Sequence, residues 1–366
     1  METSGQSVDA DITIIETMPE TTMTPEQAQQ AADAFRKDFE AVREQVARVV
    51  VGQREIVEGV LTCLFCGGHV LLEGVPGIGK TLLVRTLSQA LDLQFSRVQF
   101  TPDLMPADIT GTTIVTEVET SGQRERVFKF QQGPIFGQIV LADEVNRATP
   151  KTQSALLEAM QERSVTVGTT THQLPKPFLV MATQNPIEQE GTYPLPEAQL
   201  DRFFFKLLSL PPGRDDLAGI IDRTTSSQNT VPKAVLGAAK LLEHQALVRQ
   251  VAIASHVRDY AVRLVLTTHP KGTAHSDGAT ATYATPMVDK YVRLGSSPRG
   301  AQTLILAAKC KALIEGRFAA SIDDIRAVAQ PALRHRLIMN FESHAEGVSA
   351  DAVVANMVQT LPTEAL

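Results

Sequence analysis

Residues 74–81 read GVPGIGKT and satisfy every position of the phosphate-loop pattern G-x-x-x-x-G-K-[ST]. The pattern requires glycines because they let the backbone curl until consecutive N–H groups point inward at phosphate oxygens. Lys80 then reaches the β- and γ-phosphates, and the Thr81 hydroxyl ligates Mg²⁺. The flanking sequence fits, since 69–72 is a short apolar run typical of a buried strand and 81–91 has a helical pattern. The sequence therefore predicts a strand, a loop and a helix that bind a nucleoside triphosphate. The residues expected to contact the nucleotide here are Gly74, Val75, Pro76, Gly77, Ile78, Gly79, Lys80, Thr81 and Leu82.

A second motif is an apolar run at 139–142 that ends in Asp143 and Glu144. Because ligands bind at the carboxyl ends of strands in open α/β sheets, both carboxylates are expected beside the phosphate loop. Asp143 would hold Mg²⁺ through water, since magnesium keeps much of its water shell and takes few protein carboxylates. Glu144 would polarise the attacking water. Together the two motifs predict hydrolysis of a triphosphate.

The composition limits the classes of function. The chain has 366 residues, a formal net charge of −7 and no Trp. A domain built around nucleic acid is usually basic and stacks bases on aromatic side chains, so nucleic acid is disfavoured as a partner. No apolar run approaches the length of a membrane-spanning helix and no secretory signal is visible, so a cytoplasmic location is expected.

The cysteines are Cys63, Cys66 and Cys310. The spacing of Cys63 and Cys66 would suit a metal site or redox chemistry. However, a structural zinc site needs four ligands, and the sequence holds no second pair. The favoured interpretation is that both are small apolar residues on a buried helix.

Three parts are predicted along the chain. Residues 1–24 carry several acidic side chains and no basic one, which is typical of a solvated, disordered tail. A helix is expected to begin after Thr24, with Thr as its N-cap and Pro25 at its first position. Residues 25–212 are predicted to form an α/β domain with this N-terminal helix, and 213–366 an α-helical domain, because Leu-Pro-Pro-Gly at the end of the first part suits a hinge.

Short apolar runs that alternate with helical patterns indicate a parallel sheet covered by helices on both faces. Residues 267–286 lack periodicity and are rich in Thr, Ala, Gly and His, so a flexible surface insertion is expected there. The predicted strands are 69–72, 95–99, 138–142, 178–183 and 204–208.

Three further segments read MATQNP at 181–186, LPEAQLDRF at 195–203 and GSSPRG at 295–300. In this order, and together with the phosphate loop and DEVNRA at 143–148, they closely resemble the MoxR family of AAA+ ATPases. The resemblance covers about residues 50–346 and implies a P-loop AAA+ fold. That fold is an α/β, parallel-sheet nucleotide domain with a helical lid domain and two hairpin insertions, and its substrate is ATP with Mg²⁺.

The resemblance also assigns roles to three polar residues. Asn185 would be sensor 1, bound to the γ-phosphate or the attacking water, although an Asn that ends a strand is more often a turn former. Arg202 would be the arginine finger that reaches into the neighbouring subunit's site, although without the family a bond to a nearby carboxylate would be the default. Arg299 would be sensor 2, acting either in its own subunit or in the next. The residues expected against the adenine are Val51, Gly52 and Gln53.

Two hairpins are predicted from alternating strand patterns around turn residues. One pairs 115–119 with 127–130, and the other pairs 165–168 with 172–174. In AAA+ relatives such hairpins face the pore of the ring and touch the substrate, whereas ordinary surface hairpins are the alternative. Neither carries clustered Lys, Arg or aromatic side chains, so DNA tracking is disfavoured.

The leading hypothesis is an ATP-driven remodelling chaperone that works as a homo-hexameric ring. The resemblance implies von Willebrand factor A domain proteins as partners, and the insertion of metals or cofactors or the maturation of complexes as the task. A nucleic-acid motor or loader is one alternative, and a P-loop kinase of small molecules is another. The identity of the client stays open at this point.

Overall fold

The computed structural model describes residues 23–74, 79–120, 123–185, 191–225, 230–271 and 283–364. The expected acidic tail up to residue 22, residues 75–78 of the phosphate loop and 272–282 of the expected insertion lie outside the described residues. The first described helix begins as predicted. Thr24 caps it, and the Thr24 hydroxyl accepts from the Gln27 N–H while the Gln27 side chain binds the Thr24 N–H, which completes a capping box.

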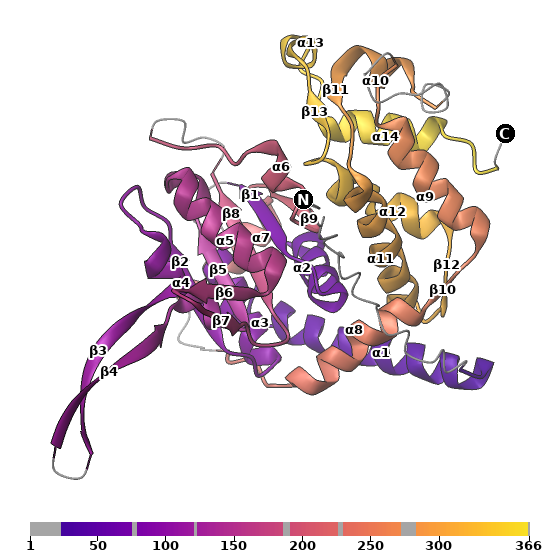
Figure 1. Cartoon of the computed structure of the whole chain (residues 1–366). Coiled ribbons are helices and arrows are strands. Elements are labelled where there is room, and N and C mark those ends of the chain that lie inside the picture. Colours follow the sequence, from indigo (N-terminus) through magenta and orange to yellow (C-terminus); the bar gives the residue numbers. More distant parts are fainter. Residues whose placement is uncertain are drawn as a thin grey trace, which may run out of the picture.

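The described elements follow one another along the chain as a strand-and-helix half and then a mainly helical half (Figure 1). The helices are α1 Pro25–Ala47, α2 Arg54–Cys66, α3 Lys80–Ala90, α4 Pro106–Thr110, α5 Pro150–Glu162, α6 Glu197–Leu200, α7 Arg214–Thr225, α8 Ala238–Gln250, α9 Ser255–Thr267, α10 Pro286–Tyr291, α11 Pro298–Ile314, α12 Ile322–Leu333, α13 Phe341–Ala345 and α14 Ala350–Thr360. The strands are β1 Val70–Gly74, β2 Phe95–Gln99, β3 Gly111–Thr120, β4 Gln123–Gln132, β5 Ile139–Asp143, β6 Ser164–Val167, β7 Thr170–Gln173, β8 Leu179–Gln184, β9 Phe205–Ser209, β10 Ala252–Ile253, β11 Val292–Leu294, β12 Ala319–Ala320 and β13 Ile338–Met339.

The central sheet has the strand order β2-β5-β8-β1-β9, and every pair in it is parallel. The predicted parallel sheet is therefore confirmed. Strand β2 has the predicted bounds, and β5, β8 and β9 each begin and end one residue later than predicted. Strand β1 begins one residue later and ends two residues later than predicted. The prediction ended these strands with their apolar residues. In the structure the hydrogen-bonded pairing of the strands continues onto polar residues, as in the pairs Glu73 with Gln184 and Gln99 with Asp143.

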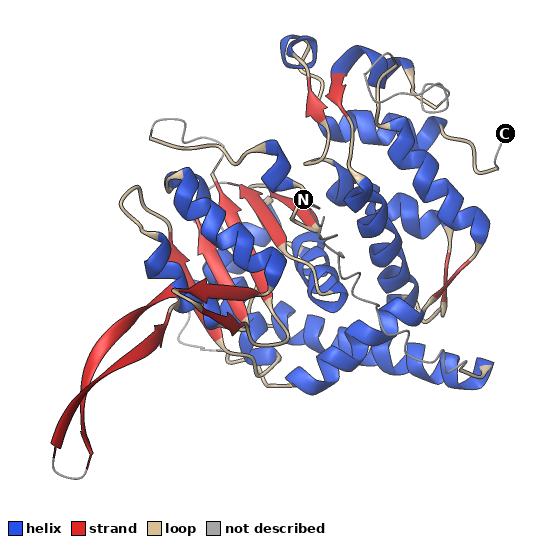
Figure 2. Cartoon of the chain, in the orientation of Figure 1, coloured by secondary structure: helices blue, strands red, loops and turns tan. Residues whose placement is uncertain are grey.

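Helices cover both faces of this sheet (Figure 2). Side chains alternate along a strand, so neighbouring residues enter different cores. Leu71 lies in a core with Met160 of α5, whereas Val70 and Leu72 lie in a core with Phe35 of α1. Long apolar runs in the central strands are explained by this double burial.

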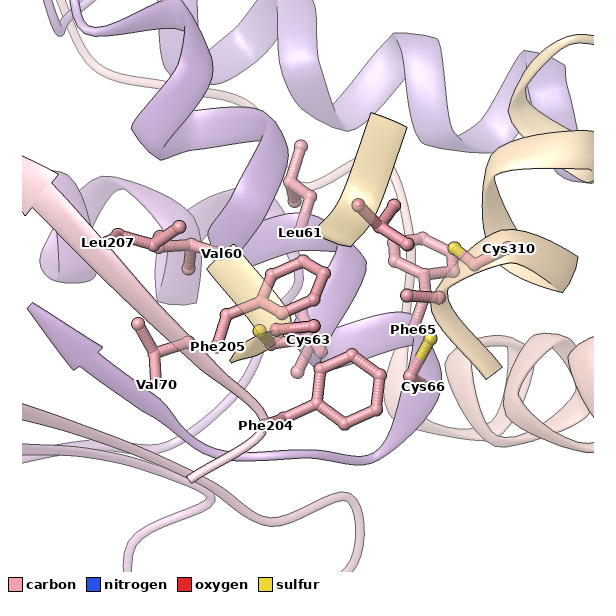
Figure 3. Close-up of a cluster of buried hydrophobic side chains, with 14 of the residues drawn as sticks. Val60, Leu61, Cys63, Phe65, Cys66, Val70, Phe204, Phe205, Leu207 and Cys310 are labelled. Carbon is pink, nitrogen blue, oxygen red and sulfur yellow. The ribbon is translucent and has the colours of Figure 1, made fainter. Parts of the chain in front are cut away.

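The core on the α1 face continues into the C-terminal helical half. Figure 3 shows Cys63 and Cys66 of α2 between Phe205 of β9 and Cys310 of α11. All three thiols are buried and unbridged. Burial raises the pKa of the Cys63 and Cys66 thiols, so they stay protonated. The predicted burial of both residues on a helix is confirmed.

The two predicted hairpins are confirmed as β3–β4 and β6–β7. The first is longer than predicted and projects away from the rest of the molecule (Figure 1). Phe130 of β4 stacks on His172 of β7 with ring centroids 4.0 Å apart, so the two hairpins contact each other through these side chains. Among the helices of the described part of the chain, none is both long and apolar enough to span a membrane.

Candidate active site

The phosphate loop leaves β1 at Gly74 and enters α3 at Gly79. Gly79 has φ +80°, a left-handed conformation that favours glycine, and it caps α3. Gly74 is required for a different reason, since a Cβ there would lie 2.5 Å from the Ser209 carbonyl oxygen. The N-terminus of α3 is thereby held at the end of β1, where its free N–H groups favour an anion. Val75, Pro76, Gly77 and Ile78 lie outside the described residues.

Lys80 is half-buried at this helix start, and its Nζ donates to the Gly74 carbonyl at 2.8 Å. Burial lowers the pKa of Lys80, while the negative charges of Asp143 and Glu144 act to raise it. A cation with one carbonyl partner, close to two carboxylates and at a helix N-terminus, suits a phosphate with a bound divalent cation.

Asp143 is the last residue of β5, and both its oxygens have partners. The Thr183 hydroxyl donates to Oδ1 at 2.6 Å, and Arg97 Nη2 donates to Oδ2 at 2.7 Å. Thr183 lies on β8 and Arg97 on β2, so the two strands that flank β5 orient the carboxylate. Arg97 is exposed, and its guanidinium places a positive charge beside the Asp143 carboxylate.

Glu144 follows directly with φ +58°, so it breaks the alternation of the strand. Its N–H donates to the Thr183 hydroxyl at 2.9 Å, and that hydroxyl in turn donates to Asp143. Glu144 Oε2 accepts from Gln99 Nε2 at 2.8 Å and from Arg147 Nη1 at 2.9 Å. Two donors therefore hold the carboxylate that is expected to act as a base.

These residues line one cavity of about 460 Å³. Asn185 enters it from the end of β8, next to β5 and β1 in the sheet. The structure therefore brings the second half of the predicted phosphate loop, from Gly79 to Leu82, together with both carboxylates and Asn185 at the carboxyl ends of adjacent strands. The lining is Gly79, Lys80, Thr81, Leu82, Arg97, Gln99, Asp143, Glu144 and Asn185.

Arg202 and Arg299 line a different cavity, of about 340 Å³. It shares no lining residue with the cavity around Lys80. Arg163 and Arg336 also line it, and Asp201 is the one carboxylate in its lining. The cavity is therefore rich in positive charge, and in the described part of the chain the two arginines do not line the cavity around Lys80.

The residues expected against the adenine lie elsewhere again. Gly52 and Gln53 both have positive φ, at +67° and +53°, and they form the turn before α2. Helix α7 packs on this turn so closely that a Cβ on Gly52 would lie 2.5 Å from an Asp216 carboxylate oxygen. Neither Val51, Gly52 nor Gln53 lines the cavity around Lys80.

Comparisons with known proteins agree with this geometry. Residues 69–205 match the ATPase family associated with various cellular activities (AAA), and residues 285–357 match the AAA lid domain. The chain is 42% identical to Chaperone MoxR1 of Mycobacterium tuberculosis over 87% of this chain and 80% of that protein. It is 31% identical to Protein MoxR of Paracoccus denitrificans, over 87% of this chain and 94% of that one. The chain belongs to the MoxR family of AAA+ ATPases.

Solved structures support the same assignment. A crystal structure of a candidate ATPase from Cytophaga hutchinsonii superposes on this MoxR-family chain with a TM-score of 0.81 at 38% identity. The match covers 92% of this chain and 98% of the other. The α/β core with its helical lid is therefore the AAA+ fold. The boundary predicted between residues 212 and 213 stays a prediction, since it falls between the two matched ranges.

Sequence reasoning missed the residues that support the site of this MoxR-family ATPase. Arg97 and Gln99 are polar residues at alternate positions of β2, so they share one face of the sheet and both reach the carboxylate pair. That alternation was a usable signal. Thr183 gave no comparable signal, because one hydroxyl in an apolar strand is common.

Proposed function

We propose that this MoxR-family ATPase is a remodelling chaperone that hydrolyses ATP at sites shared between neighbouring subunits of a homo-hexameric ring. The observation that carries the proposal is the division of the chemistry between two cavities. One holds Lys80 and the carboxylate pair, and the other holds Arg202 and Arg299 with excess positive charge. Among the described residues, neither cavity has a complete set of hydrolytic groups, so a second copy is needed to complete the site.

In the first cavity each side chain has one task. The Lys80 ammonium binds phosphate oxygens, and Thr81 and Asp143 would hold Mg²⁺. When bound there with Mg²⁺, ATP supplies the phosphoanhydride bond whose hydrolysis provides the free energy. Glu144 Oε1 or Oε2 takes a proton from the attacking water, and Asn185 orients that water from the end of β8.

The neighbouring subunit would contribute the second cavity. A triphosphate under attack carries more negative charge than Lys80 alone balances, and a guanidinium stabilises it through paired N–H donors. Arg202 and Arg299 lie in one cavity, so we propose that both act on the neighbour's nucleotide. This assigns Arg299, whose site was left open by the sequence, to the next subunit.

The hairpin β3–β4 is the proposed contact with the client. Phe128 is 80% exposed, and Val115, directly opposite it, is 55% exposed. An exposed aromatic beside a β-branched residue, on a hairpin that projects from the core, suits binding of an unfolding polypeptide rather than a charged nucleic acid. Proteins with a von Willebrand factor A domain are the proposed partners, and insertion of metals or cofactors in the cytoplasm is the proposed task. The name of the relative Chaperone MoxR1 supports the general role.

The experiment is the Glu144→Gln variant, with Glu162→Gln on the exposed end of α5 as the matched control. We expect Glu144→Gln to bind ATP with unchanged affinity but to lose about 100-fold or more in kcat, since it lacks the base. Glu162→Gln should hydrolyse ATP like the wild type. In the presence of ATP, the Glu144→Gln ring should retain a client that mass spectrometry can identify.

Three outcomes would contradict the proposal. Unchanged hydrolysis by Glu144→Gln would show that Glu144 is not the base. Stimulation by DNA that disappears at higher salt would favour the nucleic-acid motor. Transfer of the γ-phosphate to a metabolite, with hydrolysis insensitive to Arg202→Ala, would favour the small-molecule kinase.

A further inference from the structure

We propose that Asp201 and Arg336 are positioning residues that tie Arg202 and Arg299 into one unit, so that the lid sets the geometry of both arginines. The inference rests on the proposed function, in which these arginines serve the neighbouring site. Asp201 precedes Arg202 in the core, and Arg336 lies 135 positions away, just beyond α12 in the lid.

The Arg336 side chain is buried and binds the backbone on both sides of Arg202. Its Nη2 donates to the Phe203 carbonyl at 2.7 Å and to the Asp201 carbonyl at 3.2 Å. Its Nη1 donates to the Phe204 carbonyl at 3.3 Å. The carbonyls that flank the proposed arginine finger are therefore fixed by one guanidinium from the lid.

The two residues that follow α12 also bind backbone carbonyls of this core segment. His335 Nε2 donates to the Phe203 carbonyl at 3.1 Å, and Arg334 Nη1 donates to the Lys206 carbonyl at 3.2 Å. Burial and the neighbouring positive charge of Arg336 lower the pKa of His335, so it stays neutral. A neutral ring with Nε2 protonated is the form that makes this bond.

The Asp201 carboxylate joins the same backbone to the start of α11. Oδ1 accepts from Arg336 Nε at 2.9 Å, and Oδ2 accepts from the Ser297 hydroxyl at 2.8 Å. Ser297 caps α11 by accepting from the Arg299 N–H at 3.1 Å. Arg299 Nε lies 3.9 Å from the same Oδ2. The Asp201 carboxylate is thus connected to Arg299 through Ser297, and to Arg202 through the peptide bond that joins residues 201 and 202.

Arg202 itself remains available for a ligand. No hydrogen bond or ion pair joins its guanidinium to any other residue in the part of the chain that the structure describes. Its backbone neighbours are fixed, while its charged group has no partner among the described residues. This is the arrangement expected of a group that is positioned by its surroundings and completed by an anion from another subunit.

Breaking the link is expected to disturb both arginines together. A buried guanidinium needs its carboxylate partner and its full set of acceptors, so Arg336 keeps its position only while Asp201 is in place. A small shift of the 201–204 backbone moves Arg202, and the loss of the Ser297 bond frees the start of α11. Errors of about 1 Å in such a group cost on the order of 100-fold in rate.

The test compares Asp201→Asn with Glu197→Gln. Glu197 lies on α6, four positions earlier, and pairs with Arg293 of the lid at 2.9 Å, so it controls for loss of any core-to-lid ion pair. We expect Asp201→Asn to lower kcat at least about tenfold while KM for ATP stays within about twofold. Glu197→Gln should change neither constant. Equal behaviour of the two variants would overturn the proposal.

A second readout separates a positioning role from a structural one. Mixed with Lys80→Ala subunits, Asp201→Asn subunits should regain activity, because their intact phosphate loop then meets an intact Arg202 from the neighbour. Damage confined to the subunit's own site predicts no recovery and would overturn the proposal. If Asp201→Asn no longer assembles, Ser297→Ala replaces it with the same expectation. Mixtures of Lys80→Ala with Arg202→Ala test the proposed function separately. If ATP hydrolysis recovers in those mixtures but not in mixtures with Asp201→Asn, the positioning role of Asp201 is contradicted and the shared site is not.

Discussion

At the scale of a single residue, His69 joins the start of β1 to β8 and α5, beside the cavity that Arg202 and Arg299 line. Its Nδ1 accepts from the Val180 N–H of β8 at 3.0 Å, and its Nε2 donates to the Met160 carbonyl of α5 at 3.1 Å. Burial, outweighing the hydrogen bond to Met160, lowers the pKa of His69 to about 4, with Arg163 adding to the shift. Only the neutral ring can accept from Val180, so protonation must break this link.

Stability is expected to fall in acid because of this histidine. Its pKa is lower in the folded state than the ordinary 6.5, so between these values the unfolded chain binds the extra proton. The stabilisation is complete above pH 6.5 and is lost as the pH falls towards 4, at a cost on the order of 3 kcal/mol. Urea unfolding of the wild type and of His69→Gln at pH 7 and 4.5 should show a smaller acid loss for the variant. Parallel losses would contradict the assignment.

A second expectation at this scale concerns adjacent carboxylates at the start of α12. Asp324 is buried, closes the capping box with Ser321 and accepts from Arg317 at 2.7 and 3.0 Å. Burial alone would raise the pKa of Asp324, but the bonds from Arg317 and Ser321 outweigh it and lower the pKa. Asp324→Ala should therefore lower the free energy of unfolding by about 3 kcal/mol.

The control for Asp324 is its neighbour. The Asp323 side chain is 88% exposed and pairs with Arg326 at 3.3 Å. Asp323→Ala should cost no more than about 1 kcal/mol, because exposed pairs and first-turn charges contribute little. Chemical denaturation of both variants decides the matter, and equal losses would show that the buried cap is not special.

At the scale of elements, the sequence predicts what local patterns encode. The apolar runs predict all five strands of the central sheet to within two residues at each end, and Thr24 marks the start of α1. The link between Asp201 and Arg336 could not be predicted in this way, since it joins positions 135 apart and neither residue stands out locally. The alternating polar residues of β2 could be predicted only in part. Their pattern is local, but their partners lie at the end of β5, on a neighbouring strand.

The hairpin β3–β4 gives a prediction at this scale. Phe128 and Phe130 lie two positions apart on one strand and so share a face, but Phe130 stacks on His172 and packs against the core. Phe130→Ala should lower the free energy of unfolding by about 1–2 kcal/mol, whereas Phe128→Ala should change it by less than about 0.5 kcal/mol. Basal ATP hydrolysis should be retained by Phe128→Ala. A larger loss of stability for Phe128→Ala would place that ring in a contact within the chain.

At the scale of the whole molecule, the core and the lid are joined in two ways. A continuous apolar core runs from α2 and β9 to α11, and the Asp201–Arg336 contact lies beside it. The lid therefore carries Arg299 and holds the backbone on both sides of Arg202, which belongs to the core. A rotation of the lid would reach the neighbouring subunit through the two arginines.

The central claim is that hydrolysis needs groups from two subunits, and subunit mixing tests it most directly. Lys80→Ala and Arg202→Ala should each be inactive alone. In mixed rings, an Arg202→Ala subunit next to a Lys80→Ala subunit has an intact phosphate loop and an intact finger. Random mixing at equal amounts should restore about a quarter of the wild-type activity. With co-assembly verified by differently tagged subunits, no recovery would show that Arg202 acts within its own chain and would contradict the account.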